Sequence, residues 1–348
     1  MTMISDFAAA GKNSFGLVRL IAAMAVVVSH SYIIVGGMSV LQPLEALTGY
    51  PLGAHAVHVF FTVSGMLVAA SFDRRPSELA FGAARFFRIY PGLIMATLLV
   101  FLAMALLVST SSFSEIMTGS GGSYFAKILI GLAGSSSISG VFDNLPLAGE
   151  VNVPIWTLKY EVICYITLGL VMAFVVRSKL ITALQAATVI LIVSGLWMLR
   201  GLAYNDAHFI DHIARFSFSF WVGVAAWHLR DKIAMRFDIF AALLIITALS
   251  IYLHLLVVPH FLIITTGYAA LQLGQYRFGK LSEFTDRNDL SYGVYIYGWP
   301  LQQTLLLHNP GFGPLMLAFA SLIILLPLAY LSWRLIEKPA LKMKDRFV

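Results

Sequence analysis

The chain has 348 residues, of which 59% are apolar and only 11% are charged. Soluble domains contain roughly 45–50% apolar and about 25% charged residues, so this composition excludes a disordered chain and an ordinary soluble enzyme. The mean hydropathy of +0.85 indicates an integral membrane protein. The net charge of +6 is typical of basic cytoplasmic loops, and we therefore expect no nucleic-acid partner.

Apolar runs recur along the chain, each long enough to cross a hydrocarbon core roughly 30 Å thick as a helix. Because lipid satisfies no backbone hydrogen bonds, these runs predict an all-α bundle of about ten transmembrane helices. We expect one membrane-embedded domain over residues 1–348. The predicted helices cover residues 15–37, 53–72, 90–109, 155–176, 180–200, 209–228, 237–256, 258–276, 291–308 and 314–333.

The placement of basic residues predicts the orientation of these helices. With ten helices and both termini in the cytoplasm, the cytoplasmic segments contain most of the 23 Lys and Arg residues, as the positive-inside rule requires. An eleventh crossing helix over residues 124–138 would place basic segments outside. Residues 110–154 are therefore predicted to form a long outer loop that contains a re-entrant or interfacial piece.

The first predicted helix contains two ionisable residues, Arg19 and His30, at depths where charge is costly. They are eleven residues apart, which is about three helical turns, so they share one face with roughly 16 Å of rise between them. Arg19 is expected near the cytoplasmic end and His30 past the middle of the membrane. The alternative is an Arg that reaches to the interface and a His that is hydrogen-bonded inside the bundle.

Basic residues also gather before the third predicted helix, where Arg85 and Arg88 are three residues apart on one helical face. Guanidinium groups bind phosphate in a bidentate geometry, so this pair indicates a phosphorylated ligand from the cytosol. The alternative is ordinary anchoring by basic residues on the cytoplasmic side.

The fourth predicted helix contains Glu161 about two turns, or roughly 10 Å, below the outer interface. Tyr165 lies one turn deeper on the same face. In a core about 30 Å thick, the depths of Glu161 and His30 nearly coincide, so we expect the carboxylate and the imidazole to meet. An ion pair between Glu161 and Lys159, or an arginine, is the structural alternative.

Further polar residues in the predicted helices are weaker candidates. His55 and His58 lie on one face at the start of the second helix, and Arg215 lies six residues into the sixth. The sequence contains no phosphate-binding loop, dinucleotide fingerprint or metal-binding motif, so we expect no metal.

Taken together, these clusters resemble the acyltransferase-3 family of bacterial integral-membrane O-acyltransferases. The resemblance implies about ten helices in the bacterial inner membrane and transfer of an acyl group, usually acetyl from acetyl-CoA, to a hydroxyl of a cell-surface or lipid-linked glycan. Some members carry a C-terminal esterase-like domain, which we do not expect in this sequence. The matching segments follow the order of the family and are FGLVRLIAAMAVVVSH, HVFFTVSGMLVAAS, RFFRIYPGL, NVPIWTLKYEVICY, LSYGVYIYGWPLQQ and LSWRLIEKPA.

The resemblance also implies roles for individual residues. His30 completes the first family motif and would act as the general base, or would itself attack the thioester to form a covalent acyl-histidine. Glu161 matches the family acid and would orient the imidazole. Family members often have an acidic residue where this chain has His58. Arg19, Arg85 and Arg88 are expected to bind acyl-CoA, and Trp156, Tyr165 and His58 are expected to contact the acceptor.

A proton-coupled transporter or flippase of lipid-linked glycan is the alternative function, because its helices would also contain buried Arg, His and Glu. The sequence lacks the two-half repeat and the paired broken helices of many carriers. Hydrolysis or transfer of acetyl from acetyl-CoA would distinguish the enzyme from a carrier.

Overall fold

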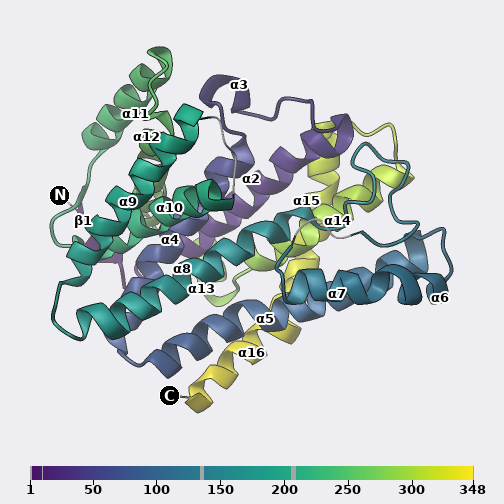
Figure 1. Cartoon of the computed structure of the whole chain (residues 1–348), viewed down its shortest axis with the longest axis horizontal. Helices are drawn as coiled ribbons and strands as arrows, with labels where there is room; N and C mark the ends of the chain where they lie inside the picture. The colour runs from purple at the N-terminus through teal and green to yellow at the C-terminus, as the bar shows by residue number, and fades with distance from the viewer. Residues whose placement is uncertain (1, 10, 134–136, 205–208, 348) are drawn as a thin grey trace. The chain divides into compact units, whose positions relative to one another are not determined.

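The computed structural model describes residues 2–9, 11–133, 137–204 and 209–347, and these are mainly helical (Figure 1). Each of the ten ranges that the sequence predicts is helical over most of its length. Among the described residues, six helices are long and apolar enough to cross a membrane: Phe15–Gly36, Leu52–Arg74, Glu78–Val108, Val153–Phe174, Ala183–Gly201 and Pro314–Met343.

The other four predicted ranges also form helices, but these are shorter or more polar. Two of them, α11 (Phe237–Tyr252) and α12 (Val258–Gly274), have 16 and 17 residues. The remaining two, α10 (Phe209–His228) and α14 (Ser291–His308), contain several polar side chains. A membrane protein is therefore confirmed, whereas the count of ten crossing helices stays a prediction.

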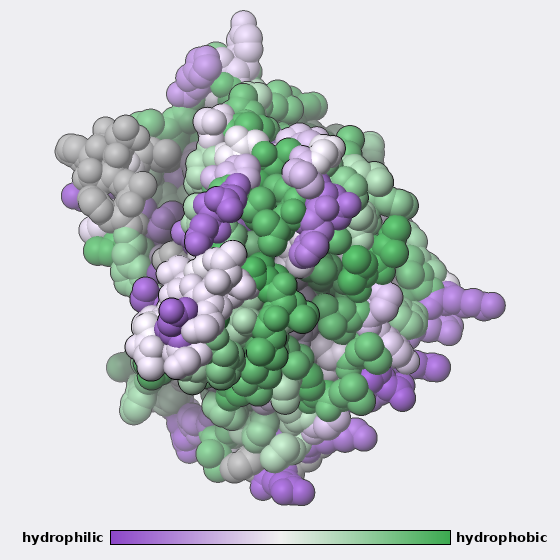
Figure 2. Space-filling model, turned by 90° about the vertical axis from the view of Figure 1, so that its right-hand side faces the viewer, coloured by the Kyte–Doolittle hydropathy of each residue, from purple (hydrophilic) through white to green (hydrophobic). Residues whose placement is uncertain are grey.

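Many large apolar side chains are exposed on the surface. On α9 (Ala183–Tyr204), Val189, Ile192, Val193 and Leu196 form an exposed stripe with helical spacing. Figure 2 shows apolar side chains as a broad band on the face in view. An exposed apolar surface of this extent is expected where the surroundings are lipid rather than water.

The chain divides into two compact units, and the first comprises residues 1–19, 55–82 and 160–287. Here α9 and α10 form one helical hairpin and α11 and α12 form another (Figure 1). The N-terminus adds a two-residue antiparallel strand pair that the sequence did not predict. The unit also contains β1 (Thr2–Met3), α1 (Ile4–Phe7), β2 (Ala234–Met235), α13 (Lys280–Arg287), η4 (Val171–Val176) and most of α4 (Leu52–Arg74) and α8 (Leu158–Leu170).

Two glycines allow α4 and α10 to pack in close contact. A Cβ atom on Gly65 would lie 2.0 Å from the carbonyl oxygen of Phe220, and one on Gly223 would lie 1.9 Å from that of Thr62. The hydroxyl of Thr62 donates to the carbonyl of Ser219 at 3.1 Å. The absence of two side chains therefore sets the distance between these helices.

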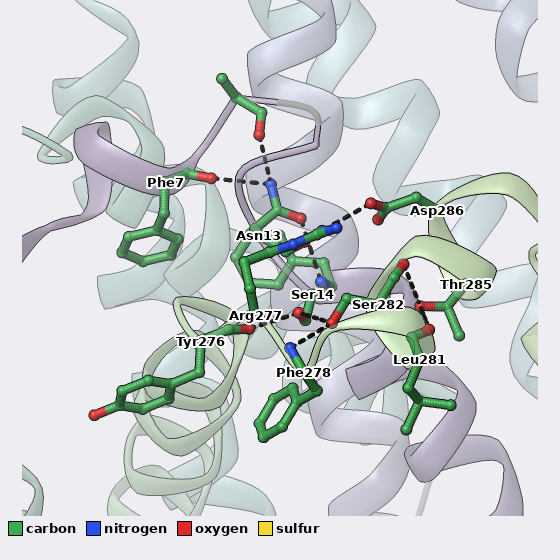
Figure 3. A network of polar contacts seen from close by, with 12 residues as sticks. Phe7, Asn13, Ser14, Tyr276, Arg277, Phe278, Leu281, Ser282, Thr285 and Asp286 are labelled. Carbon is green, nitrogen blue, oxygen red and sulfur yellow. Dashed lines mark hydrogen bonds and ion pairs between the residues drawn. The ribbon is translucent and has the colours of Figure 1, made fainter.

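A polar network holds the start of α2 (Phe15–Gly36) against α13 and the loop before it (Figure 3). The hydroxyl of Ser14 lies 2.6 Å from that of Ser282 and donates to the carbonyl of Tyr276. Arg277 donates to the carbonyl of Asn13 and pairs with Asp286 at 2.7 Å. These bonds fix the first turn of the helix that contains Arg19.

The second unit comprises residues 20–54, 83–159 and 288–348. Here α14 lies beside α15 (Pro314–Ser332), and α7 (Gly122–Leu129), with eight residues, is too short to cross a bilayer. Part of the predicted outer loop, residues 134–136, lies outside the described residues. The unit also contains α3 (Glu45–Thr48), most of α5 (Glu78–Ala103), η1 (Met104–Val108), α6 (Phe113–Ile116), η2 (Met117–Gly121), η3 (Val153–Thr157), η5 (Trp333–Glu337), α16 (Lys338–Met343) and η6 (Lys344–Phe347).

Candidate active site

The imidazole of His30 lies against the indole of Trp299 on α14. The two ring centroids are 5.1 Å apart, and the ring planes meet at 77° in an edge-to-face arrangement. Trp299 is 1% exposed, and its indole N–H donates to the carbonyl of Glu150 at 2.8 Å. A hydrogen bond also joins α2 and α14, because Gln302 donates to the carbonyl of Val27 at 2.9 Å.

The C-terminal part of the outer loop runs along α14 and is held to it by side-chain hydrogen bonds. Pro300 has no N–H, so it leaves the carbonyl of Ile296 without its helical partner. The amide of Asn152 donates to that carbonyl at 2.9 Å. Gln303 donates to the carbonyls of Leu147 and Glu150 at 3.1 and 3.3 Å. A proline in the helix thus creates one of the acceptors that fix the loop.

The loop ends in η3, which places Trp156 just before Glu161. The hydroxyl of Tyr295 on α14 donates to the carbonyl of Pro154 at 3.0 Å and lies 2.6 Å from the hydroxyl of Thr157. Trp156 lies between these two anchored residues and is half-buried. Its backbone position is therefore fixed by α14.

Burial also affects the carboxyl group of Glu150 in this loop. Glu150 has one carboxylate oxygen that is buried without a hydrogen-bond partner among the described residues. Loss of hydration disfavours the charged form, so burial raises the pKa of the Glu150 carboxyl.

In the first unit, Glu161 forms a hydrogen-bonded cluster with Tyr165 and Ser64. The phenol of Tyr165 donates a short hydrogen bond to the carboxylate of Glu161 one turn earlier on α8. Ser64 on α4 lies 2.9 Å from the Tyr165 hydroxyl and 3.5 Å from the same carboxylate oxygen. Glu161 is half-buried and Tyr165 is buried. The predicted shared face of Glu161 and Tyr165 is therefore present.

His58 lies on α4 and Arg215 on α10, the two helices that pack closely at Gly65 and Gly223. His58 is 1% exposed, and its ring centroid is 6.2 Å from that of His55. Phe61 stacks on Phe216 at 4.7 Å beside them. His58 is therefore part of a packed helix contact.

The predicted arginine pair lies on α5, but its second member already has acidic partners. Arg88 pairs with Asp289 at 2.7 Å, and Glu337 is 3.9 Å from its guanidinium. Arg85, one turn earlier, is half-buried, as is Arg19 on α2.

The predicted residues therefore fall into separate groups. Glu161 and Tyr165 are in direct contact, and Arg85 and Arg88 share one helix. His30 belongs to the second unit and Glu161 to the first, so their meeting stays a prediction. No cluster of metal-ligating side chains occurs within the described parts of the chain.

Sequence reasoning missed several residues of these groups. Trp299 belongs to a segment that resembles the family. Its position in that segment does not indicate that its side chain faces His30. Ser64 lies among apolar residues, and no helical spacing to other polar residues distinguishes it as a site residue. Glu337 is an acidic residue near the end of an apolar helix, a signal that could have identified it.

Six long apolar helices among the described residues, some of which contain Arg, His or Glu, define a polytopic membrane protein. The acyltransferase family, described as "Acyltransferase domain", matches residues 12–334. The chain belongs to this family. It is therefore an acyltransferase, and the alternative of a transporter is not retained. The predicted family membership is confirmed, and every candidate residue lies within the matched range.

Two curated proteins are similar to the chain over nearly their whole length. An "O-acetyl transferase" of Shigella phage Sf6 is 28% identical over 340 residues, which cover 94% of this chain and 95% of that protein. "Nodulation protein 10" of Rhizobium leguminosarum bv. viciae is 26% identical over 368 aligned residues, which cover 97% and 95%. No solved structure matches the chain.

Proposed function

We propose that this protein is an O-acetyltransferase that moves an acetyl group from cytosolic acetyl-CoA to a hydroxyl of a cell-surface or lipid-linked glycan. The observation that carries the proposal is the family match, which includes His30 within an apolar helix long enough to cross the membrane. The similar phage protein is named an O-acetyl transferase, which supports transfer of acetyl to oxygen.

The proposed topology follows from the sequence. Ten helices would cross a bacterial inner membrane as one domain, with both termini in the cytoplasm, because this arrangement places most basic residues inside. The outer loop would then face the compartment from which the acceptor glycan enters.

In the proposed reaction, His30 removes the proton from the acceptor hydroxyl. The hydroxyl oxygen attacks the thioester carbonyl, the new C–O bond forms, and the C–S bond breaks. The proton then passes from His30 to the departing thiolate, so the products are the acetyl ester and free CoA. Histidine suits this exchange because its reference pKa of about 6.5 lies near neutral pH.

Glu161 is proposed to assist His30. A carboxylate that accepts a hydrogen bond from Tyr165, with Ser64 nearby, is held in a fixed position. A fixed carboxylate can stabilise a protonated imidazole, as the acid does in a catalytic triad. The proposal that it acts on His30 rests on the similar depths of the two residues in their predicted helices.

The arginines are proposed to have two different roles, since some bind the donor and one anchors a helix. Arg85 and Arg19 would hold the phosphates of acetyl-CoA on the cytoplasmic side, since guanidinium groups suit phosphate geometry. Arg88 is paired with Asp289 and lies near Glu337, so we assign it to holding α5 in place.

The acceptor is proposed to contact Trp156, Tyr165 and His58. Trp156 lies in a turn anchored on α14, where its indole offers an apolar face of the kind that packs on sugar rings. The membrane lipid that carries a lipid-linked saccharide would reach the same helices from the bilayer.

The test is acetyl transfer by the purified full-length protein in detergent, with radiolabelled acetyl-CoA and extracted membrane glycans. We expect incorporation of label into glycan and release of CoA. His30→Ala should lower the rate by at least about 10²-fold, the usual scale for loss of a general base. Absence of both CoA release and labelled glycan from folded protein would overturn the proposal.

A further inference from the structure

Trp299 presents a fixed surface to the imidazole of His30. The indole is 1% exposed, and its N–H donates to the Glu150 carbonyl at 2.8 Å. A buried indole whose N–H is hydrogen-bonded is restricted to one orientation. The edge-to-face contact at 5.1 Å therefore restricts the orientation of the imidazole as well.

The turn of α2 that precedes His30 is held by the turn of α14 that follows Trp299. Gln302 is fully buried and donates to the carbonyl of Val27, which lies three residues before His30 on α2. Trp299 and Gln302 are themselves three residues apart, so one face of α14 contacts both the ring of His30 and the turn that carries it. The two contacts together limit the rotation and the translation of the imidazole.

We propose that Trp299 is a positioning residue for His30, which it keeps in the orientation that accepts the proton of the acceptor hydroxyl. This inference rests on the proposed function, in which His30 is the base. A base must lie within hydrogen-bond distance of the proton it removes, and a displacement of about 1 Å can lower a rate by about 10²-fold. Trp299 acts through His30.

The support of Trp299 extends into the outer loop. The Glu150 carbonyl accepts hydrogen bonds from both Trp299 and Gln303, and Gln303 also binds the Leu147 carbonyl. The loop segment that we propose to face the acceptor side is therefore part of the structure that orients the base.

The test compares Trp299→Phe with a matched control, Trp221→Phe. The phenyl ring of the first variant keeps an aromatic group beside His30 but loses the bond to Glu150. Trp221 on α10 is also fully buried, and its indole N–H has no hydrogen-bond partner among the described residues. Both variants lose the same volume, so a general packing defect should appear equally in both.

We expect Trp299→Phe to lower kcat about 10-fold and to leave the KM for acetyl-CoA unchanged, because the donor contacts remain. Trp221→Phe should change kcat less than twofold. In a His30→Ala background, Trp299→Phe should cause no further loss, since residues that act as a unit are strongly non-additive.

Three other results would be decisive. Equal losses in the two Trp variants, or a further full loss in the His30→Ala background, would overturn the positioning role while the base role stands. Full activity of His30→Ala would overturn the proposed mechanism itself. Trp299→Tyr, whose ring has a polar hydroxyl group, provides a second variant if the Phe variant is poorly produced. The same kinetic criteria apply to it.

Discussion

Arg88 on α5 and Asp289, just before α14, form an ion pair of 2.7 Å in which both side chains are less than one-fifth exposed. Glu337 lies 3.9 Å from the same guanidinium and is hydrogen-bonded to Ser332 at 3.0 Å. The guanidinium also lies 5.7 Å from the centre of the Tyr292 ring. One cation thereby joins three helical segments of the second unit.

Replacement of Arg88 by Ala should therefore destabilise the protein. Two acidic side chains would lose their cation, and removal of one partner of a buried ion pair typically costs about 3–5 kcal/mol. We expect a lower Tm in detergent and lower abundance in the membrane. Arg177→Ala is the control, because its 2.9 Å pair with Glu78 is exposed and should contribute little. An unchanged Tm together with lost CoA binding would instead assign Arg88 to the donor.

Arg85→Lys should weaken donor binding without loss of folded protein. Lysine keeps the charge and the orientation signal but lacks the planar bidentate group. Calorimetric titration of CoA should give a Kd increased by about 10-fold. Arg75→Lys, an exposed change in the preceding segment, should leave the Kd unchanged. Equal affinity of the Arg85 variant and the native protein would favour simple anchoring.

Glu161→Gln should remove most of the activity and leave Tm nearly unchanged. The amide can still accept the hydrogen bond from Tyr165, but it lacks the charge that would stabilise a protonated imidazole. The double variant with His30→Ala should be barely slower than His30→Ala alone. The measurement is a four-point kinetic cycle, with melting recorded for each variant. Multiplicative losses would show that the two residues act independently.

Gly223→Ala should disrupt the contact between α4 and α10. The added Cβ would lie 1.9 Å from a backbone carbonyl oxygen, which cannot move aside as a flexible side chain would. We expect little folded protein by size-exclusion chromatography. Gly82→Ala is the control, because its Cβ would have no neighbour within 4 Å and alanine favours a helix by about 1 kcal/mol. Normal folding of the Gly223 variant would show that the two helices can separate at low cost.

The exposed face of α13 should lie in the lipid interface. Ser282 and Thr285 are buried, whereas Leu281 and Phe284 on the other face are exposed. A helix that buries its polar face in the protein and exposes its apolar face is expected to place the apolar face among acyl chains. After Cys164→Ser, a spin label on Phe284→Cys should be accessible to oxygen and shielded from a water-soluble nickel complex. A label on Glu283→Cys should show the reverse, and equal nickel access at both positions would place α13 in water.

The sequence by itself determined the class of the protein and the positions of its long apolar helices. Apolar runs must form helices in lipid because no water is present to satisfy the backbone, so length and composition suffice to locate them. The family motifs also follow from local sequence, because they record residue types at fixed spacing. The contact of Glu161 with Tyr165 was predictable for the same reason, since both lie one turn apart on one helix.

Only the tertiary structure decided which residues from distant segments meet. Trp299 is 269 residues from His30 along the chain, and no periodicity within α14 shows which helix its indole contacts. Likewise, the pairing of Arg88 with Asp289 depends on how α5 and α14 pack. Helix formation is a local property of the chain, whereas a contact between two helices depends on the side chains of both and on the close approach that their small residues permit.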